Sequence, residues 1–197
     1  MILALVILAA GTVTAGGNAI TCNGIWSPTL SEQELIRHFG KANVAREMVY
    51  IGEGNEEPAT VLFPKDEKKR VEIAWKNKYR NPEWIRIPAG SQWRSFANVR
   101  NGMTLSELET LNGRPFNFYG FEWDFSGQVT NWRAGRLAST GGPCTLSIQL
   151  DRNVPETLTK KQEQALDATS GDRELLSSSA NVRMFQTFVG QILIQYP

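Results

Sequence analysis

The sequence predicts an α+β fold of two tandem units. Each unit is a short helix followed by an antiparallel β-meander, with the helices on one face of the sheet. Two observations predict this arrangement. A helix-start segment occurs twice in the 197 residues, first at Ser31 and again at Thr104. Each copy precedes several short runs of alternating apolar and polar residues separated by turn residues, as in neighbouring strands of a meander.

The repeated segment has the same order of residue types in both copies. An apolar residue precedes a hydroxyl residue, a Glu follows three positions later, a Leu comes next, and a Gly and a basic residue end the segment. The hydroxyl can cap the helix start, and the Glu can accept a hydrogen bond from the capping residue's amide. The Gly can take the left-handed conformation that ends a helix. The segment therefore predicts helices over 31–39 and 104–111.

The first unit, residues 20–88, contains four strand patterns after its helix. They lie at 48–51, 59–63, 71–75 and 83–87, and turn residues or a polar loop separate them. In the last of them, Trp84 and Arg86 face one side and Ile85 and Ile87 the other, as period-2 alternation requires. The pattern predicts a four-stranded meander.

The second unit, residues 89–150, repeats this in compressed form. Its strand patterns lie at 116–119, 120–125, 127–132 and 144–150. Residues 151–180 form a polar excursion in which a short helix fits around 160–168. Residues 181–197 are again apolar and predict a strand that packs back onto the domain.

Residues 1–19 have the pattern of a secretory signal. An apolar core of about ten residues is followed by small residues, and the core is too short to span a membrane. The positive residues that usually begin such a signal are missing, and a buried N-terminal strand or helix is the alternative. The signal predicts an exported protein, either periplasmic or extracellular.

The predicted export bears on the state of the two cysteines. Cys22 and Cys144 form an even pair, which in an oxidising compartment predicts one disulfide. Two alternatives stay open. Cys22 could carry a lipid, although Ala19-Ile20-Thr21 before it fits a lipidation site poorly, or both thiols could be unpaired.

Composition and motifs exclude several classes of function. The formal net charge is +1 and the basic residues are scattered among acidic ones, which gives no electrostatic footprint for nucleic acid. The single histidine, His38, lies near a helix end, where a positive charge favours the dipole. One His and two paired Cys supply too few ligands for zinc. We predict no catalytic residues, no cofactor and no metal site.

Aromatic residues are the most suggestive feature of the second unit. Residues 116–125 hold six of them; by alternation Phe121, Trp123 and Phe125 would share one strand face and belong to the core. The functional interpretation is a concave sheet face whose exposed aromatics bind a protein partner, since Trp and Tyr dominate interface hot spots. The candidate anchors are Trp26, Trp84, Trp93, Tyr119 and Trp132.

The start of the second unit resembles a known family. Gly102-Met103-Thr104, followed by a short helix that ends in Gly113-Arg114-Pro115, looks like the β-lactamase inhibitor protein-like superfamily. That superfamily includes the small lipoprotein of the outer-membrane β-barrel assembly machinery. The resemblance implies tandem helix-plus-sheet units and brings no catalytic residues. The first unit lacks the Gly-Met-Thr at the matching place.

We therefore expect an exported bacterial protein that acts as a non-enzymatic protein-binding module of the cell envelope. Its partner would be another envelope or secreted protein, and a membrane would be involved only if Cys22 carries a lipid. One alternative is a structural envelope lipoprotein. A second is a carboxylate-dependent carbohydrate-active enzyme that uses Glu122 and Asp124 beside the aromatics.

Overall fold

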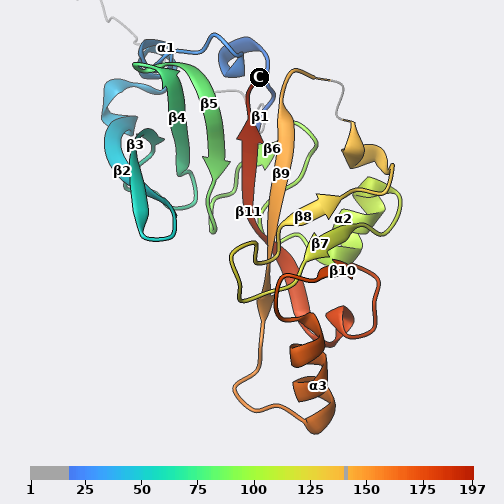
Figure 1. The fold of residues 1–197 in the computed structure, drawn as a ribbon. Coiled ribbons are helices and arrows are strands. Elements are labelled where there is room, and N and C mark those ends of the chain that lie inside the picture. Colours follow the sequence, from blue (N-terminus) through green and yellow to red (C-terminus); the bar gives the residue numbers. More distant parts are fainter. Residues whose placement is uncertain (1–17, 140–141) are drawn as a thin grey trace, which may run out of the picture.

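The computed structural model describes residues 18–139 and 142–197, and within them the chain has an α+β fold. Its helices are α1 (Glu32–Phe39), α2 (Leu105–Asn112) and α3 (Lys160–Thr169). Four 3₁₀ turns accompany them: Gly24–Trp26, Lys41–Asn43, Arg136–Ala138 and Val182–Met184. The predicted fold class is confirmed, and Figure 1 shows the helices distributed around one large antiparallel sheet.

The large sheet has six antiparallel strands. In spatial order they are β2 (Val44–Gly52), β3 (Asn55–Leu62), β4 (Val71–Asn77), β5 (Arg80–Ile87), β11 (Gln186–Gln195) and β9 (Thr145–Asn153). A three-stranded sheet holds β10 (Glu174–Leu176), β7 (Asn117–Tyr119) and β8 (Val129–Asn131). The short strands β1 (Ala19–Ile20) and β6 (Arg94–Ser95) pair in parallel. The first four strands of the large sheet are the predicted first meander.

The second meander joins the first through its last strand. β11 pairs with β5, for example Ile192 opposite Ile87, and β9 lies on the other side of β11. A bridge between Gln128 and Gln149 brings the start of β8 to β9. The second unit therefore runs β7, β8, β9, β11, with α3 and β10 inserted before β11. Figure 1 shows α3 at the opposite end of the molecule from α1.

Both predicted helix caps are present as capping boxes. The hydroxyl of Ser31 accepts from the Glu34 amide while Glu34 accepts from the Ser31 amide, and Thr104 and Glu107 do the same. Gly113 takes the left-handed conformation as predicted, whereas Gly40 has φ 85° with an extended ψ of 143°. The 3₁₀ turn Lys41–Asn43 then leads from Gly40 into β2.

The first helix is fixed to the sheet by a buried carboxylate. Glu32 accepts hydrogen bonds from Arg46 Nε at 2.9 Å and from Thr60 Oγ1 at 2.9 Å. Trp75 Nε1 donates to the same hydroxyl at 2.9 Å. These bonds connect α1 with β2, β3 and β4, so Glu32 does more than favour the helix dipole.

The predicted disulfide is confirmed. Cys22 and Cys144 are bonded, with their Cα atoms 6.1 Å apart, and both are buried in the main core. The bond attaches the N-terminal segment to the start of β9. The predicted signal falls almost wholly on residues 1–17, outside the described part of the chain. No helix in the described part is long and apolar enough to span a membrane.

The polar excursion and the C-terminal run are both structured. Lys160–Thr169 forms α3, which confirms the helix expected there, and Thr159 and Gln162 supply a third capping box. β10 then pairs with β7, which the sequence did not indicate. The C-terminal strand β11 is an inner strand of the large sheet because it pairs with β9 along its length and with β5 through residues 192–195.

The predicted strand at 120–125 is wrong. The chain turns at Glu122, whose φ is 75°, and Ser126 N donates to Trp123 O at 2.8 Å. Gly120 and Gly127 bracket this turn at close backbone approaches, since a Cβ at either one would overlap a neighbouring carbonyl. Residues 121–126, named the aromatic loop below, leave the sheet instead of extending it.

Candidate functional site

Two of the five predicted aromatic anchors lie in the core. Trp26 is 4% exposed and Trp93 is 5% exposed, and their rings meet edge to face at 5.4 Å. The Trp93 indole donates to Lys69 O at 2.9 Å, and the Trp26 carbonyl accepts from the Tyr196 hydroxyl. Both predictions are wrong because these side chains fill the space between α1, the disulfide and the large sheet.

The other three predicted anchors are half-buried. Trp132 packs on Phe116 at 5.1 Å, and the ring of Tyr119 lies 5.4 Å from that of Phe125. Trp84 packs against a small cluster of Val49, Ala59 and Val61 on the sheet face away from α1. These three residues are partly accessible, but other apolar side chains are more exposed to solvent.

Four of the seven exposed large apolar residues in the described part of the chain lie on two facing segments. Trp123 is 64% exposed and Phe125 is 57% exposed on the aromatic loop. Tyr50 is 59% exposed and Ile51 is 48% exposed in residues 50–55, named the β2–β3 turn below. Alternation had placed Trp123 and Phe125 in the core. The closely spaced glycines at 120 and 127 were the sequence signal that the strand is interrupted.

A hollow of about 640 Å³ separates the aromatic loop from the β2–β3 turn. We name it the cleft. Its floor is the open sheet face, represented by Arg86 of β5, Gln191 of β11 and Gln149 of β9. Its two walls are the β2–β3 turn and the aromatic loop. The cleft thus lies where the two units join, and each unit supplies one wall.

Strong curvature of the first meander forms one wall of the cleft, the β2–β3 turn. Three strand spacings separate β2 from β5, which in a flat sheet is about 14 Å. Yet Arg86 Nη1 on β5 donates to Tyr50 O on β2 at 2.7 Å. The end of β2 therefore bends over the open face, and the side chain of Arg86 holds it there.

A chain of ion pairs lies inside this curve. Arg86 Nε donates to Glu72 at 2.6 Å, Arg70 Nε donates to the other Glu72 oxygen at 2.8 Å, and Arg70 also bonds Glu47 at 2.9 Å. The side chain of Glu72 is only 7% exposed. The network connects β2, β4 and β5 across the concave face and fixes the guanidinium that bonds Tyr50.

The other wall, the aromatic loop, is fixed by the buried residue Arg152. Its guanidinium donates to Glu122 of the aromatic loop at 2.6 Å and to Thr169 and Ser170 at the end of α3. It also lies over the ring of Phe121, 4.4 Å from the centroid. One buried cation therefore joins β9, α3 and the aromatic loop, and the exposed aromatics sit on an anchored loop.

Glu122 stays ionised in this setting. Burial alone would raise the pKa of Glu122, but hydrogen bonds from Arg152 and Ser170 outweigh it and hold the pKa below its usual range. A lowered pKa stabilises the fold above the ordinary carboxyl pKa, and that contribution is lost as the pH falls through the lowered value. The anchor of the aromatic loop is thus formed at neutral pH.

Replacing Arg152 with Met is expected to loosen this wall. The substitution keeps apolar bulk against Phe121 but removes the hydrogen bonds to Glu122, Thr169 and Ser170. We expect a loss of about 2–3 kcal/mol in the free energy of unfolding, measured in urea. Amide exchange in residues 121–126 should accelerate. Arg173→Met, at an exposed site, is the matched control, and equal stability of the two variants would contradict this role.

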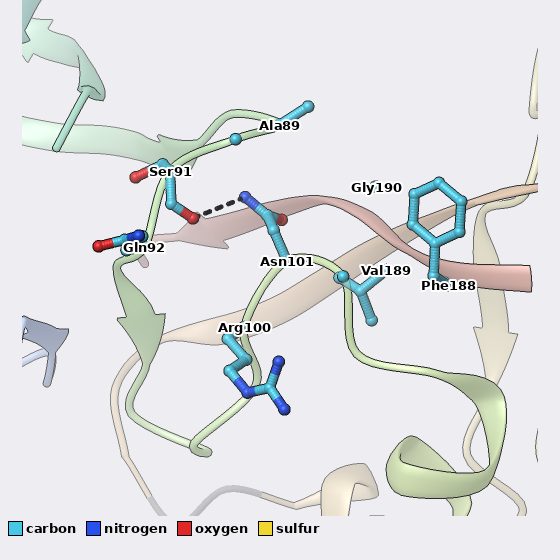
Figure 2. A pocket seen from close by; sticks show the side chains of 10 residues that line it. Ala89, Ser91, Gln92, Arg100, Asn101, Phe188, Val189 and Gly190 are labelled. Carbon is cyan, nitrogen blue, oxygen red and sulfur yellow. Dashed lines mark hydrogen bonds between the residues drawn. The ribbon is translucent and has the colours of Figure 1, made fainter. Parts of the chain in front are cut away.

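A second hollow, of about 380 Å³, lies at the seam between the units. Figure 2 shows it between the chain after β5, the segment around Asn101 and the bulged part of β11 near Gly190. The Asn101 amide donates to the carbonyls of Ile87, Pro88 and Ser91. This side chain fixes the linker between the units, and the hollow presents no exposed aromatic or charged cluster comparable with the cleft.

The cleft is chemically mixed. Its lining combines carboxylates, amides and apolar side chains, and the described residues contain no cluster of three or more His, Cys, Asp or Glu that could hold a metal. Comparison of the chain with family models, with curated proteins and with solved structures gives no match.

Proposed function

We propose that this protein is an exported, non-enzymatic binding module that holds another envelope or secreted protein in the cleft. One observation carries the proposal: three large apolar side chains that line one hollow, Trp123, Tyr50 and Ile51, are about half or more exposed, and Phe125 on the same loop as Trp123 is 57% exposed. Exposed apolar patches of this kind mark interaction sites. The disulfide is compatible with export to an oxidising compartment.

The walls of the cleft are held in place before any partner binds. Arg86 fixes the β2–β3 turn, and Arg152 fixes the aromatic loop. A binding surface that is ordered in advance loses less conformational entropy on association. The resemblance to the inhibitor superfamily, which implies tandem helix-plus-sheet units, agrees with a binding role.

The two alternatives have less support. An inverting or retaining glycosidase needs one carboxylic acid with a raised pKa, whereas the pKa of Glu122 is lowered. A lipoprotein needs the Cys22 sulfur for its lipid, whereas this sulfur is bonded to Cys144. Each feature weighs against the alternative that it concerns.

Replacing Trp123 with Ala is expected to weaken partner binding by about 30-fold or more, because buried Trp residues are the commonest hot spots. Stability should change by less than about 1 kcal/mol because Trp123 is largely exposed. The partner is first identified with a photo-crosslinking amino acid at Phe125, compared with the same group at Lys161 on α3. Affinity is then measured by calorimetry.

Leu176→Ala, at another exposed apolar position, is the matched control for Trp123→Ala. Crosslinks that form equally from positions 125 and 161, or none from position 125, would contradict the proposal. So would equal affinity of the Trp123 and Leu176 variants.

A further inference from the structure

We infer that the cleft accepts a cationic side chain, Lys or Arg, projecting from the partner protein. The inference rests on the proposed function and deepens it by assigning the chemistry of the bound segment. Two features of the cleft carry it. One is the apolar side chains of the walls, and the other is the set of charged residues in the lining that have no ion-pair partner within the described part of the chain.

The single basic residue that the described lining contains is already satisfied. Arg86 is paired with Glu72 and donates to Tyr50 O. Three of its five N–H donors are used within the chain and its side chain is only 13% exposed, so Arg86 offers little to an acidic partner.

The acidic residues of the lining are only partly neutralised. Glu122 is paired with Arg152, but Glu53 and Asp124 make no ion pair within the described part of the chain. One of these two carboxylates stands on each wall of the cleft. The described lining carries three carboxylates against one guanidinium, whereas the whole chain has a formal net charge of +1.

The walls also suit a cation that carries an apolar stem. Trp123 presents its indole on one wall, and Tyr50 and Ile51 line the other. Lys and Arg pack their methylene stems on apolar surface, and their charged groups interact favourably with aromatic faces. On the floor, Gln149 donates its amide to Ser126 O at 3.0 Å, which leaves its oxygen as an acceptor. Aromatic walls, two unpaired carboxylates and an acceptor together match a cationic side chain.

The test uses a fragment in place of the unidentified partner. N-acetyl-arginine amide is titrated into the ¹⁵N-labelled full chain, with N-acetyl-citrulline amide as an uncharged probe of the same shape and N-acetyl-lysine amide as a second cation. We expect shifts of the Trp123 indole and of the Glu53 and Asp124 amides with a dissociation constant on the order of a millimolar. Citrulline should give much smaller shifts.

Two double variants test the charge. Glu53→Gln with Asp124→Asn should weaken arginine binding about five-fold, whereas Glu163→Gln with Asp167→Asn on α3 should leave it unchanged. Equal shifts with arginine and citrulline, or an unaltered affinity in the cleft double variant, would overturn the inference. Failure of this test beside a successful crosslink at position 125 would leave the proposed function standing. Arginine binding without any crosslink would instead remove the proposed function.

Discussion

Replacing both cysteines with serine is expected to lower the free energy of unfolding by about 4–5 kcal/mol. The physical reason is the length of the closed loop: Cys22 and Cys144 are 122 positions apart. Without the bond, the unfolded chain gains the freedom that the loop had removed. For a chain of this size the loss corresponds to a fall of roughly 10–15 °C in Tm.

The measurement is urea unfolding of the wild-type chain and of the double variant, each with and without reductant. Reductant should destabilise the wild type to about the level of the variant and leave the variant unchanged. A loss below about 1 kcal/mol would show that the N-terminal segment is held by its other contacts. These are the burial of Trp26 and the pairing of β1 with β6.

Glu72→Ala is expected to cost about 3–5 kcal/mol because it removes one partner of a buried ion network. Arg86, whose side chain is only 13% exposed, would lose its carboxylate, and Arg70 would keep only Glu47. The end of β2 should also become mobile because the Arg86 guanidinium would no longer be fixed beside Tyr50. Unfolding in urea gives the energy, and amide exchange at residues 50–55 gives the mobility.

Two variants sharpen this test. Glu83→Ala, at an exposed position on β5, should stay within about 0.5 kcal/mol of the wild type. Glu72→Met combined with Arg86→Met should be less damaging than Glu72→Ala, because replacing both charges leaves no orphaned ion. The explanation is wrong if the double variant is as unstable as the single one.

The elements that local chemistry dictates were predicted well. The capping boxes at Ser31 and Thr104 need residues only three positions apart, and the four strands of the first meander follow from alternation and turn residues. The cysteine pair was predictable from its even count in a chain expected to be exported. Each of these signals lies within a short window or in a simple count.

The sequence did not identify which aromatic residues are exposed. A concave sheet face with exposed aromatics was expected, yet Trp26 and Trp93 are buried and the exposed residues are Trp123, Phe125 and Tyr50. Alternation assigns two faces to a strand but does not say which face another element covers. It also fails where the backbone turns, as it does at Glu122.

The sequence alone therefore determined the fold class, the two helix starts, the first meander and the disulfide partners. The tertiary structure decided the rest: that β11 joins the two units, that Arg86 bends β2 over the open face, and that Arg152 holds the aromatic loop opposite. The physical reason is the separation along the chain over which each interaction acts. Caps and alternation act between near neighbours, whereas the cleft depends on residues from β2, β5, β9, β11 and the aromatic loop meeting in space.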